Sequence, residues 1–235
     1  MEAPPWPWVA VVLVAVAVLL RERLVRAWRV AWRGPRPADA ALDGCELDAC
    51  AFCGAPDSSA VSHGELTVNL RRHGLLTSGE AVYAFSCVDR SDFVDDGSVR
   101  RGLAYADAAL PFASTGAQIS APHVHAAALD LVVAHAPRAR TARARTALDV
   151  GSGTGIFGAL LAEALDCEVT CVEHASELVA HAAGALRRHA RRRRRTCAVT
   201  LHTGCARAFC AAAAAPTTAH GASASTRGVA FAYNQ

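Results

Sequence analysis

A glycine-rich turn with an acidic residue on each side carries the clearest chemistry in the sequence. An apolar run ends at Asp149, and glycines then follow at alternate positions, Gly151, Gly153 and Gly155. Glycine has no Cβ, so such a backbone can turn tightly and approach a ligand closely. A second run, rich in β-forming residues, ends at Glu173, 18 residues after Gly155, where a carboxylate could accept both hydroxyls of a ribose. The pattern predicts a nucleotide-like ligand held on a strand–turn–helix unit.

The charges around this turn favour a cationic ligand over a dinucleotide. Counted from Gly151, the dinucleotide fingerprint G-x-G-x-x-G would need a glycine where this chain has Ile156. Asp149 would repel a pyrophosphate, but its carboxylate can accept a hydrogen bond from an ammonium group. S-adenosylmethionine is cationic and carries no phosphate, so it fits both acids. A purely structural turn in an unrelated α/β protein is the alternative.

Several motifs occur in one order along the chain and together carry a family resemblance. In chain order they are Ser62–Leu76, Val88–Phe93, Tyr105–Asp107 with Leu110–Pro111, Gln118–Ala126, Leu148–Gly155 and Val172–His174. They resemble the protein-L-isoaspartate (D-aspartate) O-methyltransferase family from about Ser62 to Arg188. The segment Ile119-Ser-Ala-Pro-His-Val-His-Ala126 is the most specific part. The resemblance implies an α/β fold with a Rossmann-like, S-adenosylmethionine-dependent methyltransferase sheet.

The resemblance also implies an activity and a set of site residues. The family methylates the abnormal α-carboxylate of L-isoaspartyl residues in damaged proteins, so that the ester can close to a succinimide and reopen as normal aspartate. Ser120 matches the family's active-site serine, His125 a histidine that contacts the cofactor, and Glu173 the acid that binds the ribose. The cofactor-binding residues expected from the turn and the resemblance together are Ser120, His125, Asp149, Gly151, Gly153, Gly155 and Glu173.

Methyl transfer to a carboxylate depends on positioning more than on acid–base catalysis. The nucleophile has a reference pKa near 4 and is already ionised near neutral pH, so the reaction needs no general base. The site has to bring a carboxylate oxygen to the sulfonium methyl group in a near-attack geometry. The Ser120 hydroxyl could orient this carboxylate through a hydrogen bond. The alternative is that Ser120 only caps a helix whose first turn contains Pro122.

The resemblance weakens after Arg188. Where the family has Gly-Asp-Gly-Arg at the end of its third strand, this chain has Gly204-Cys-Ala-Arg207. Cys205 therefore stands in place of an acid that faces the adenine. Residues 228–235 could form a fourth strand, which would leave the sheet short of the family's full set. We therefore expect a C-terminally truncated sheet.

An apolar segment precedes the methyltransferase-like region and predicts an N-terminal hydrophobic helix. Residues 6–20 are 15 uncharged, mostly apolar residues, and a series of arginines begins at Arg21. A secretory signal would carry its basic residues first. As a helix the segment spans about 22 Å, against about 30 Å of hydrocarbon, and snorkelling arginines with flanking tryptophans could make up the difference. The positive-inside rule would place the catalytic region in the cytoplasm; an interfacial helix, or a mispredicted start of a cytoplasmic protein, are the alternatives.

Composition argues against several other functions. The formal net charge is only +3, and most of it lies in the arginine run from Arg187 to Arg195, which we interpret as a solvated loop. No aromatic residues interleave with this run, so we expect no nucleic-acid binding. Nine cysteines, an odd number, do not suggest a disulfide framework. Cys45, Cys50 and Cys53 have no fourth ligand at matching spacing, so we expect no metal site.

These features divide the chain into three parts. We expect a membrane anchor with its basic flank at residues 1–33, a linker at 34–61 and a methyltransferase domain at 62–235. The domain should act as a monomer on isoaspartyl-containing peptides and proteins. Two other functions remain open: a catalytically inactive, membrane-tethered remnant of the fold, and a methyltransferase for a small carboxylate.

Overall fold

The computed structural model describes residues 54–112, 115–136, 146–194, 198–209 and 228–232. The chain separates into two units, Met1–Asp57 and Ser58–Gln235, and nearly all described residues belong to the second. The predicted membrane segment at residues 6–20 and the cysteines at 45, 50 and 53 lie outside the described ranges. Among the helices within those ranges, none combines the length and the apolar character that crossing a membrane requires.

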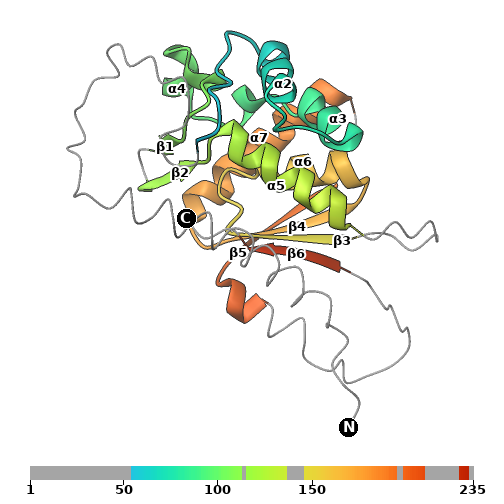
Figure 1. Cartoon of the computed structure of the whole chain (residues 1–235). Coiled ribbons are helices and arrows are strands. Elements are labelled where there is room, and N and C mark those ends of the chain that lie inside the picture. Colours follow the sequence, from blue (N-terminus) through green and yellow to red (C-terminus); the bar gives the residue numbers. More distant parts are fainter. Residues whose placement is uncertain (1–53, 113–114, 137–145, 195–197, 210–227, 233–235) are drawn as a thin grey trace. The chain divides into compact units, whose positions relative to one another are not determined.

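A parallel β-sheet forms one layer of the second unit (Figure 1). Its strands are β3 (Thr146–Val150), β4 (Glu168–Glu173), β5 (Val199–Thr203) and β6 (Gly228–Ala232). They lie in the order β5-β4-β3-β6, and each neighbouring pair is parallel. This arrangement confirms the predicted Rossmann-like sheet and the strand expected within residues 228–235. The strand order reverses at β3, and ligands of open parallel sheets bind at the carboxyl ends beside such a reversal.

Helix α6 (Ile156–Leu165) packs against β3 and β4 and is almost entirely enclosed. Eight of its ten residues are buried, as expected for a helix that is apolar on all sides. Gly158 permits the close approach to the sheet, because a Cβ there would come within 3.0 Å of the Cys171 Sγ on β4. A glycine on the helix therefore sets the distance between the two layers.

Helix α7 (Ser176–Arg193) contains most of the arginine run, so the prediction of a solvated loop was wrong for these residues. Arg188 Nε donates to the main-chain oxygen of Asp92 over 3.2 Å, and Arg192 Nη2 lies 2.8 Å from Asp92 Oδ1. Arg193 pairs with Glu163 of α6. Cations also interact favourably with the C-terminal end of a helix dipole. Acids from distant parts of the chain therefore pair with Arg192 and Arg193 of the run.

The residues before β3 form helices and a short hairpin beside α6. The elements are α2 (His63–Arg72), α3 (Gly79–Cys87), η1 (Arg90–Asp92), α4 (Asp96–Arg100), η2 (Leu103–Tyr105), β1 (Leu110–Phe112), β2 (Ala117–Ile119) and α5 (Pro122–His135). Both α3 and α5 contact α6, and Figure 1 shows them on the same face of the sheet. The Asp130 carboxylate of α5 accepts hydrogen bonds from the hydroxyls of Thr77 and Ser78 at the start of α3. These contacts fix α5 relative to α3 and α6.

The hydrophobic core lies between this helical layer and the sheet. Its fully buried side chains include Leu66 of α2, Leu129 of α5, Leu160 of α6 and Val169 of β4. Burying one such side chain stabilises a fold by about 1.5–3 kcal/mol. The core therefore joins the elements before β3 to the sheet that carries the glycine turn.

Candidate active site

The turn between β3 and α6 has the backbone that its glycines predict. Gly151, Gly153 and Gly155 have φ angles of 74°, 52° and 81°, in the left-handed region that residues with a Cβ rarely adopt. The Gly153 N–H donates to Glu173 Oε2 over 3.0 Å. The turn after β3 and the end of β4 are therefore joined directly.

The Glu173 carboxylate is more constrained than the sequence suggested. It is 5 % exposed, and its Oε1 accepts from the main-chain N–H groups of His174 and Ala175 over 2.8 and 3.0 Å. The two oxygens of a carboxylate together offer about four acceptor positions, and main-chain donors use three of them here. Glu173 thus holds the site together, and its predicted contact with a ribose remains a prediction.

Asp149 lies in the interior, between β3 and α6. The residue is 2 % exposed, and the Cys171 Sγ donates to its Oδ2 over 3.8 Å. Burial, together with the negative charge of Glu173, raises the pKa of Asp149 to about 7, although the Cys171 hydrogen bond opposes this shift. This position of Asp149 does not test the predicted hydrogen bond between its carboxylate and an ammonium group, which stays a prediction.

Ser120 lies between the end of β2 and the start of α5, and it is 6 % exposed. The N-cap of α5 is Ala121, which makes no side-chain capping bond, and Pro122 occupies the first turn as predicted. The alternative that Ser120 is only the cap of this helix is therefore wrong. Its main-chain oxygen accepts from Arg90 Nη1 over 2.7 Å.

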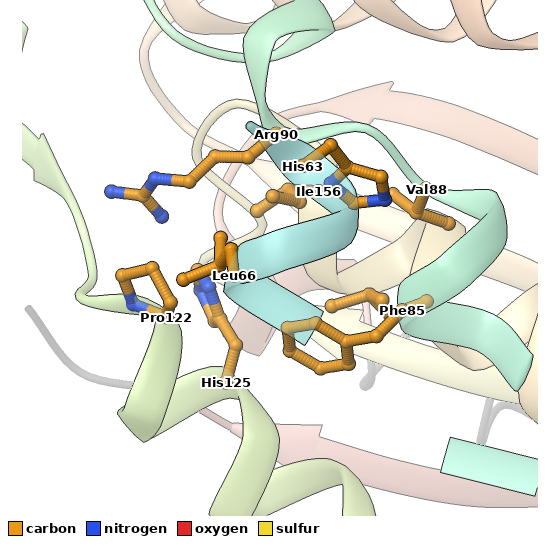
Figure 2. Close-up of a pocket in the computed structure, with 9 residues that line it drawn as sticks. His63, Leu66, Phe85, Val88, Arg90, Pro122, His125 and Ile156 are labelled. Atoms are coloured by element: carbon orange, nitrogen blue, oxygen red, sulfur yellow. The ribbon is translucent and has the colours of Figure 1, made fainter. Parts of the chain in front are cut away.

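His125 connects the start of α5 to the start of α6. Its ring stacks on Phe157 with 5.9 Å between the centroids and 24° between the planes. It also lines a small pocket with His63, Arg90 and Ile156 (Figure 2). Its surroundings lower the pKa of His125 to about 3, first through burial and then through the charge of Arg90, so the ring is neutral near pH 7. The structure thus brings the Ser120 segment beside the helix that follows the glycine turn.

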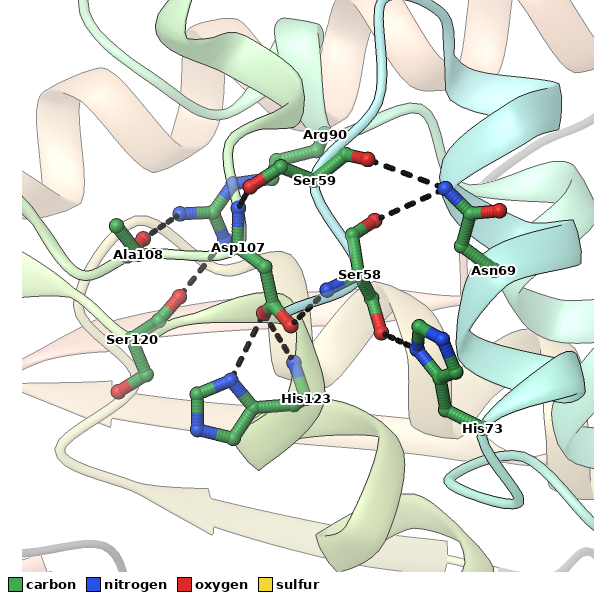
Figure 3. A network of polar contacts seen from close by, with 9 residues as sticks. All are labelled: Ser58, Ser59, Asn69, His73, Arg90, Asp107, Ala108, Ser120 and His123. Atoms are coloured by element: carbon green, nitrogen blue, oxygen red, sulfur yellow. Dashed lines mark hydrogen bonds and ion pairs between the residues drawn. The ribbon is translucent and has the colours of Figure 1, made fainter. Parts of the chain in front are cut away.

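A polar network around the start of α5 was missed by the sequence prediction (Figure 3). Asp107 Oδ1 accepts from the main-chain N–H of His123 over 2.9 Å and lies 2.8 Å from His123 Nδ1. Its Oδ2 accepts from the Ser58 N–H over 3.1 Å. Burial raises the pKa of Asp107, but hydrogen bonds from His123 outweigh it and the pKa lies below its ordinary value. Asp107 and His123 both belong to motifs that carry the family resemblance, and this was the signal for the network that the sequence offered.

Arg90 was also missed by the sequence prediction. Its side chain is 2 % exposed, and Nη2 donates to the Ala108 main-chain oxygen over 3.1 Å in addition to the bond with Ser120. Burial lowers the pKa of Arg90 to about 10, an effect opposed by Asp107, so the side chain stays charged near pH 7. Arg90 belongs to the motif Val88–Phe93 of the family resemblance, and this was the signal available in the sequence.

Cys205 occupies the same edge of the sheet as the glycine turn. It is exposed and follows Gly204, whose N–H donates to the Glu173 main-chain oxygen over 2.8 Å. Hydrogen bonds from the main-chain N–H groups of Ala208 and Arg207 lower the pKa of the Cys205 thiol. Cys205, which stands where the family has an acid, therefore lies just after the end of β5, as predicted.

Comparison with known proteins gives a consistent result. The family model of protein-L-isoaspartate(D-aspartate) O-methyltransferase matches residues 61–229. Protein-L-isoaspartate O-methyltransferase 1 of Arabidopsis thaliana is 40 % identical over 126 residues, which cover 52 % of this chain and 50 % of the relative. The Caenorhabditis elegans protein-L-isoaspartate O-methyltransferase is 34 % identical over 139 residues, covering 56 % of this chain and 54 % of the relative. The chain thus spans about half the length of these curated relatives.

A solved structure supports the fold independently. It is that of a Plasmodium falciparum protein described as a protein-L-isoaspartate O-methyltransferase, in complex with S-adenosyl-L-homocysteine. The two structures match with a TM-score of 0.50 and 23 % sequence identity, over 61 % of this chain and 63 % of the other. The order of motifs, the glycine turn beside β4 and the family match over residues 61–229 lead to one conclusion: the chain belongs to the protein-L-isoaspartate (D-aspartate) O-methyltransferase family.

Proposed function

We propose that this chain transfers a methyl group from S-adenosylmethionine to the free α-carboxylate of L-isoaspartyl residues in damaged proteins. The observation that carries the proposal is the contact between two segments distant in sequence. The segment with Ser120 and His125 packs, through the His125–Phe157 stack, beside the helix that begins at the glycine turn. A methyl-acceptor site and a cofactor site must adjoin in this way for direct transfer.

The residues around the glycine turn suit a polar cofactor. The hydroxyls of Ser152 and Thr154 are buried and have no hydrogen-bond partner within the described part of the chain. Buried polar groups normally find a partner, so these atoms are available to a ligand or to water. We assign the adenosine side of the cofactor to the turn and to Glu173.

When bound, S-adenosylmethionine would supply a methyl group on a positively charged sulfur, which is a good leaving group. The protein has to bring an ionised carboxylate to this methyl group and exclude water from the site. We assign to Ser120 the orientation of the carboxylate, by donation of a hydrogen bond. His125 is neutral near pH 7, so it would act by packing and hydrogen bonding rather than by charge.

The test is a methyl-transfer assay with the whole chain. We expect label from S-adenosylmethionine to appear in a peptide with one L-isoaspartyl residue and not in the same peptide with normal aspartate. Cofactor binding without transfer would support the inactive remnant instead. Transfer to a free dicarboxylic acid but not to the peptide would support a small-carboxylate enzyme.

We also propose that residues 6–20 attach the domain to a membrane, with the catalytic region on the cytoplasmic side. The support is the uncharged segment followed by arginines. Fractionation of cells that express the whole chain or residues 34–235 tests this proposal. If both proteins are found in the soluble fraction, the anchor is wrong and the alternative of a cytoplasmic protein applies.

We expect the extracted protein to be a monomer by light scattering.

A further inference from the structure

Arg90 has an unusual position for a cation. Its guanidinium is buried, yet no carboxylate lies within ion-pair distance of it among the described residues. The carboxylate that influences it most is Asp107, whose oxygens accept from His123 and Ser58 instead. Buried charges are normally paired, because their removal from water is costly. This position calls for an explanation beyond stability.

The two hydrogen bonds of Arg90 converge on the hairpin that leads to Ser120. Ala108 lies just before β1 and Ser120 just after β2, and the guanidinium donates to the main-chain oxygen of each, over 3.1 and 2.7 Å. Figure 3 shows the guanidinium between these two carbonyl groups, with the Ser120 hydroxyl on the side away from it. Arg90 therefore closes the base of the hairpin and fixes where β2 passes into α5.

A planar guanidinium suits this geometry better than an ammonium. Arginine presents its donors in a rigid fork, whereas lysine is a point charge on a flexible stem. The third guanidinium nitrogen, Nε, is buried and has no hydrogen-bond partner in the part of the chain that the structure describes. Arg90 also lines the pocket that contains His125 and Pro122 (Figure 2). Its positive charge thus lies beside Ser120 at the end of β2 and beside the start of α5, which carries His125.

We propose that Arg90 is the positioning residue of the methyl-acceptor site: it holds Ser120 through the main chain, and its charge favours a carboxylate over a neutral amide as the acceptor. The inference presupposes that the acceptor binds at Ser120, as in the proposed function. A carboxylate that enters this region gains attraction from a cation in a medium less polar than water. A carboxamide of the same shape does not.

The discriminating experiment compares two peptides and three variants. The peptides carry the same isoaspartyl residue with its α-carboxylate free or converted to the carboxamide. Their binding to the whole chain, saturated with S-adenosylhomocysteine, is measured by titration calorimetry. The variants are Arg90→Gln, Arg90→Lys and, as a matched control, Arg188→Gln. Arg188 also donates to a main-chain oxygen, that of Asp92, but it is exposed and does not contact Ser120.

The expected result for Arg90→Gln is a loss of about tenfold in affinity for the carboxylate peptide, since the attraction between two partly buried unit charges about 10 Å apart is equivalent to roughly that factor. Affinity for the carboxamide peptide should change little, so the preference for the carboxylate is lost. Arg90→Lys should keep this preference and lower kcat, because an ammonium group cannot hold both carbonyls. Arg188→Gln should bind both peptides like the wild type.

Two outcomes overturn the inference. One is an unchanged preference for the carboxylate in Arg90→Gln; the other is an equal loss of affinity for both peptides and for S-adenosylhomocysteine, which would make Arg90 a general support of the fold. If Arg90→Gln does not melt cooperatively, the result for Arg90→Lys decides between the two possibilities. An unchanged kcat in Arg90→Lys refutes the positioning role. A wild type that binds the carboxylate peptide selectively but does not methylate it refutes the proposed function and leaves the binding test of Arg90 valid.

Discussion

Replacing Gly158 with alanine is the sharpest test of how closely α6 approaches the sheet. The added Cβ would come within 3.0 Å of the Cys171 Sγ, and would contact Asp149 Oδ2 at 3.5 Å and Val169 Cγ1 at 3.7 Å. Overpacking of this kind costs about 1–3 kcal/mol, and the contact here is short enough to justify the upper value. Alanine in place of glycine inside a helix returns about 1 kcal/mol. We therefore expect Gly158→Ala to lower the free energy of unfolding by about 2 kcal/mol.

Thermal melting of the whole chain, followed by circular dichroism, measures this change. For a domain of this size, 2 kcal/mol corresponds to a fall in melting temperature of about 4–8 °C. Gly184→Ala in α7 is the matched control, since a Cβ there meets nothing closer than 3.5 Å, from Arg188 Nη1. The control receives the same gain in helix propensity without overpacking, so its melting temperature should rise slightly.

A double mutant identifies the atom responsible. In a Cys171→Ala background the Sγ is absent, so Gly158→Ala should become neutral or stabilising, with a coupling free energy of about 2–3 kcal/mol. If Gly158→Ala raises the melting temperature of the wild type as Gly184→Ala does, α6 does not pack as closely as described. If the loss persists in the Cys171→Ala background, the sulfur is not its cause.

Three further substitutions test the candidate site. Glu173→Ala should weaken S-adenosylmethionine binding by about 2 kcal/mol, since hydrogen bonds to charged groups contribute about 1.5–3 kcal/mol; equal affinities by titration calorimetry would remove the ribose role. Ser120→Ala should lower turnover more than cofactor affinity, and unchanged turnover on an isoaspartyl peptide would argue against a role in orientation. Burial raises the pKa of Asp149 to about 7 from about 3.9 in the unfolded chain. The native state therefore binds a proton that the unfolded chain has lost, so the free energy of unfolding should fall as the pH rises from about 4 through 7. Asp149→Asn should lessen this fall. If the melting temperatures of wild type and variant change in parallel over this pH range, the raised pKa is contradicted.

Local features of the site could be predicted from the sequence because each depends on neighbouring residues. The positive φ angles at Gly151, Gly153 and Gly155 follow from glycines at alternate positions after an apolar run. Glu173 ends β4 because the β-rich run ends there. The parallel sheet follows from strands separated by helical segments. All of these signals lie within about one strand–turn–helix unit.

Features that depend on distant residues could not be predicted in this way. The arginine run was assigned to a loop because its acids, Asp92 and Glu163, lie 100 and 30 residues earlier. Gly158 carried no assignment in the sequence analysis, because its neighbour on β4, the Cys171 Sγ, is what requires a glycine there. The side chain of Arg90 has no role until the hairpin brings Ala108 and Ser120 to it.

The hydrogen bonds of Glu173 also determine when the glycine turn becomes ordered. Its carboxylate links the Gly153 amide to the turn that follows β4 through hydrogen bonds within the chain itself. The conformational entropy of this turn is therefore lost during folding and not during binding. A binding site that is already rigid gives higher affinity for the same set of contacts. Slow hydrogen exchange of the Gly153 amide in the unliganded protein would be the direct sign of this preorganisation.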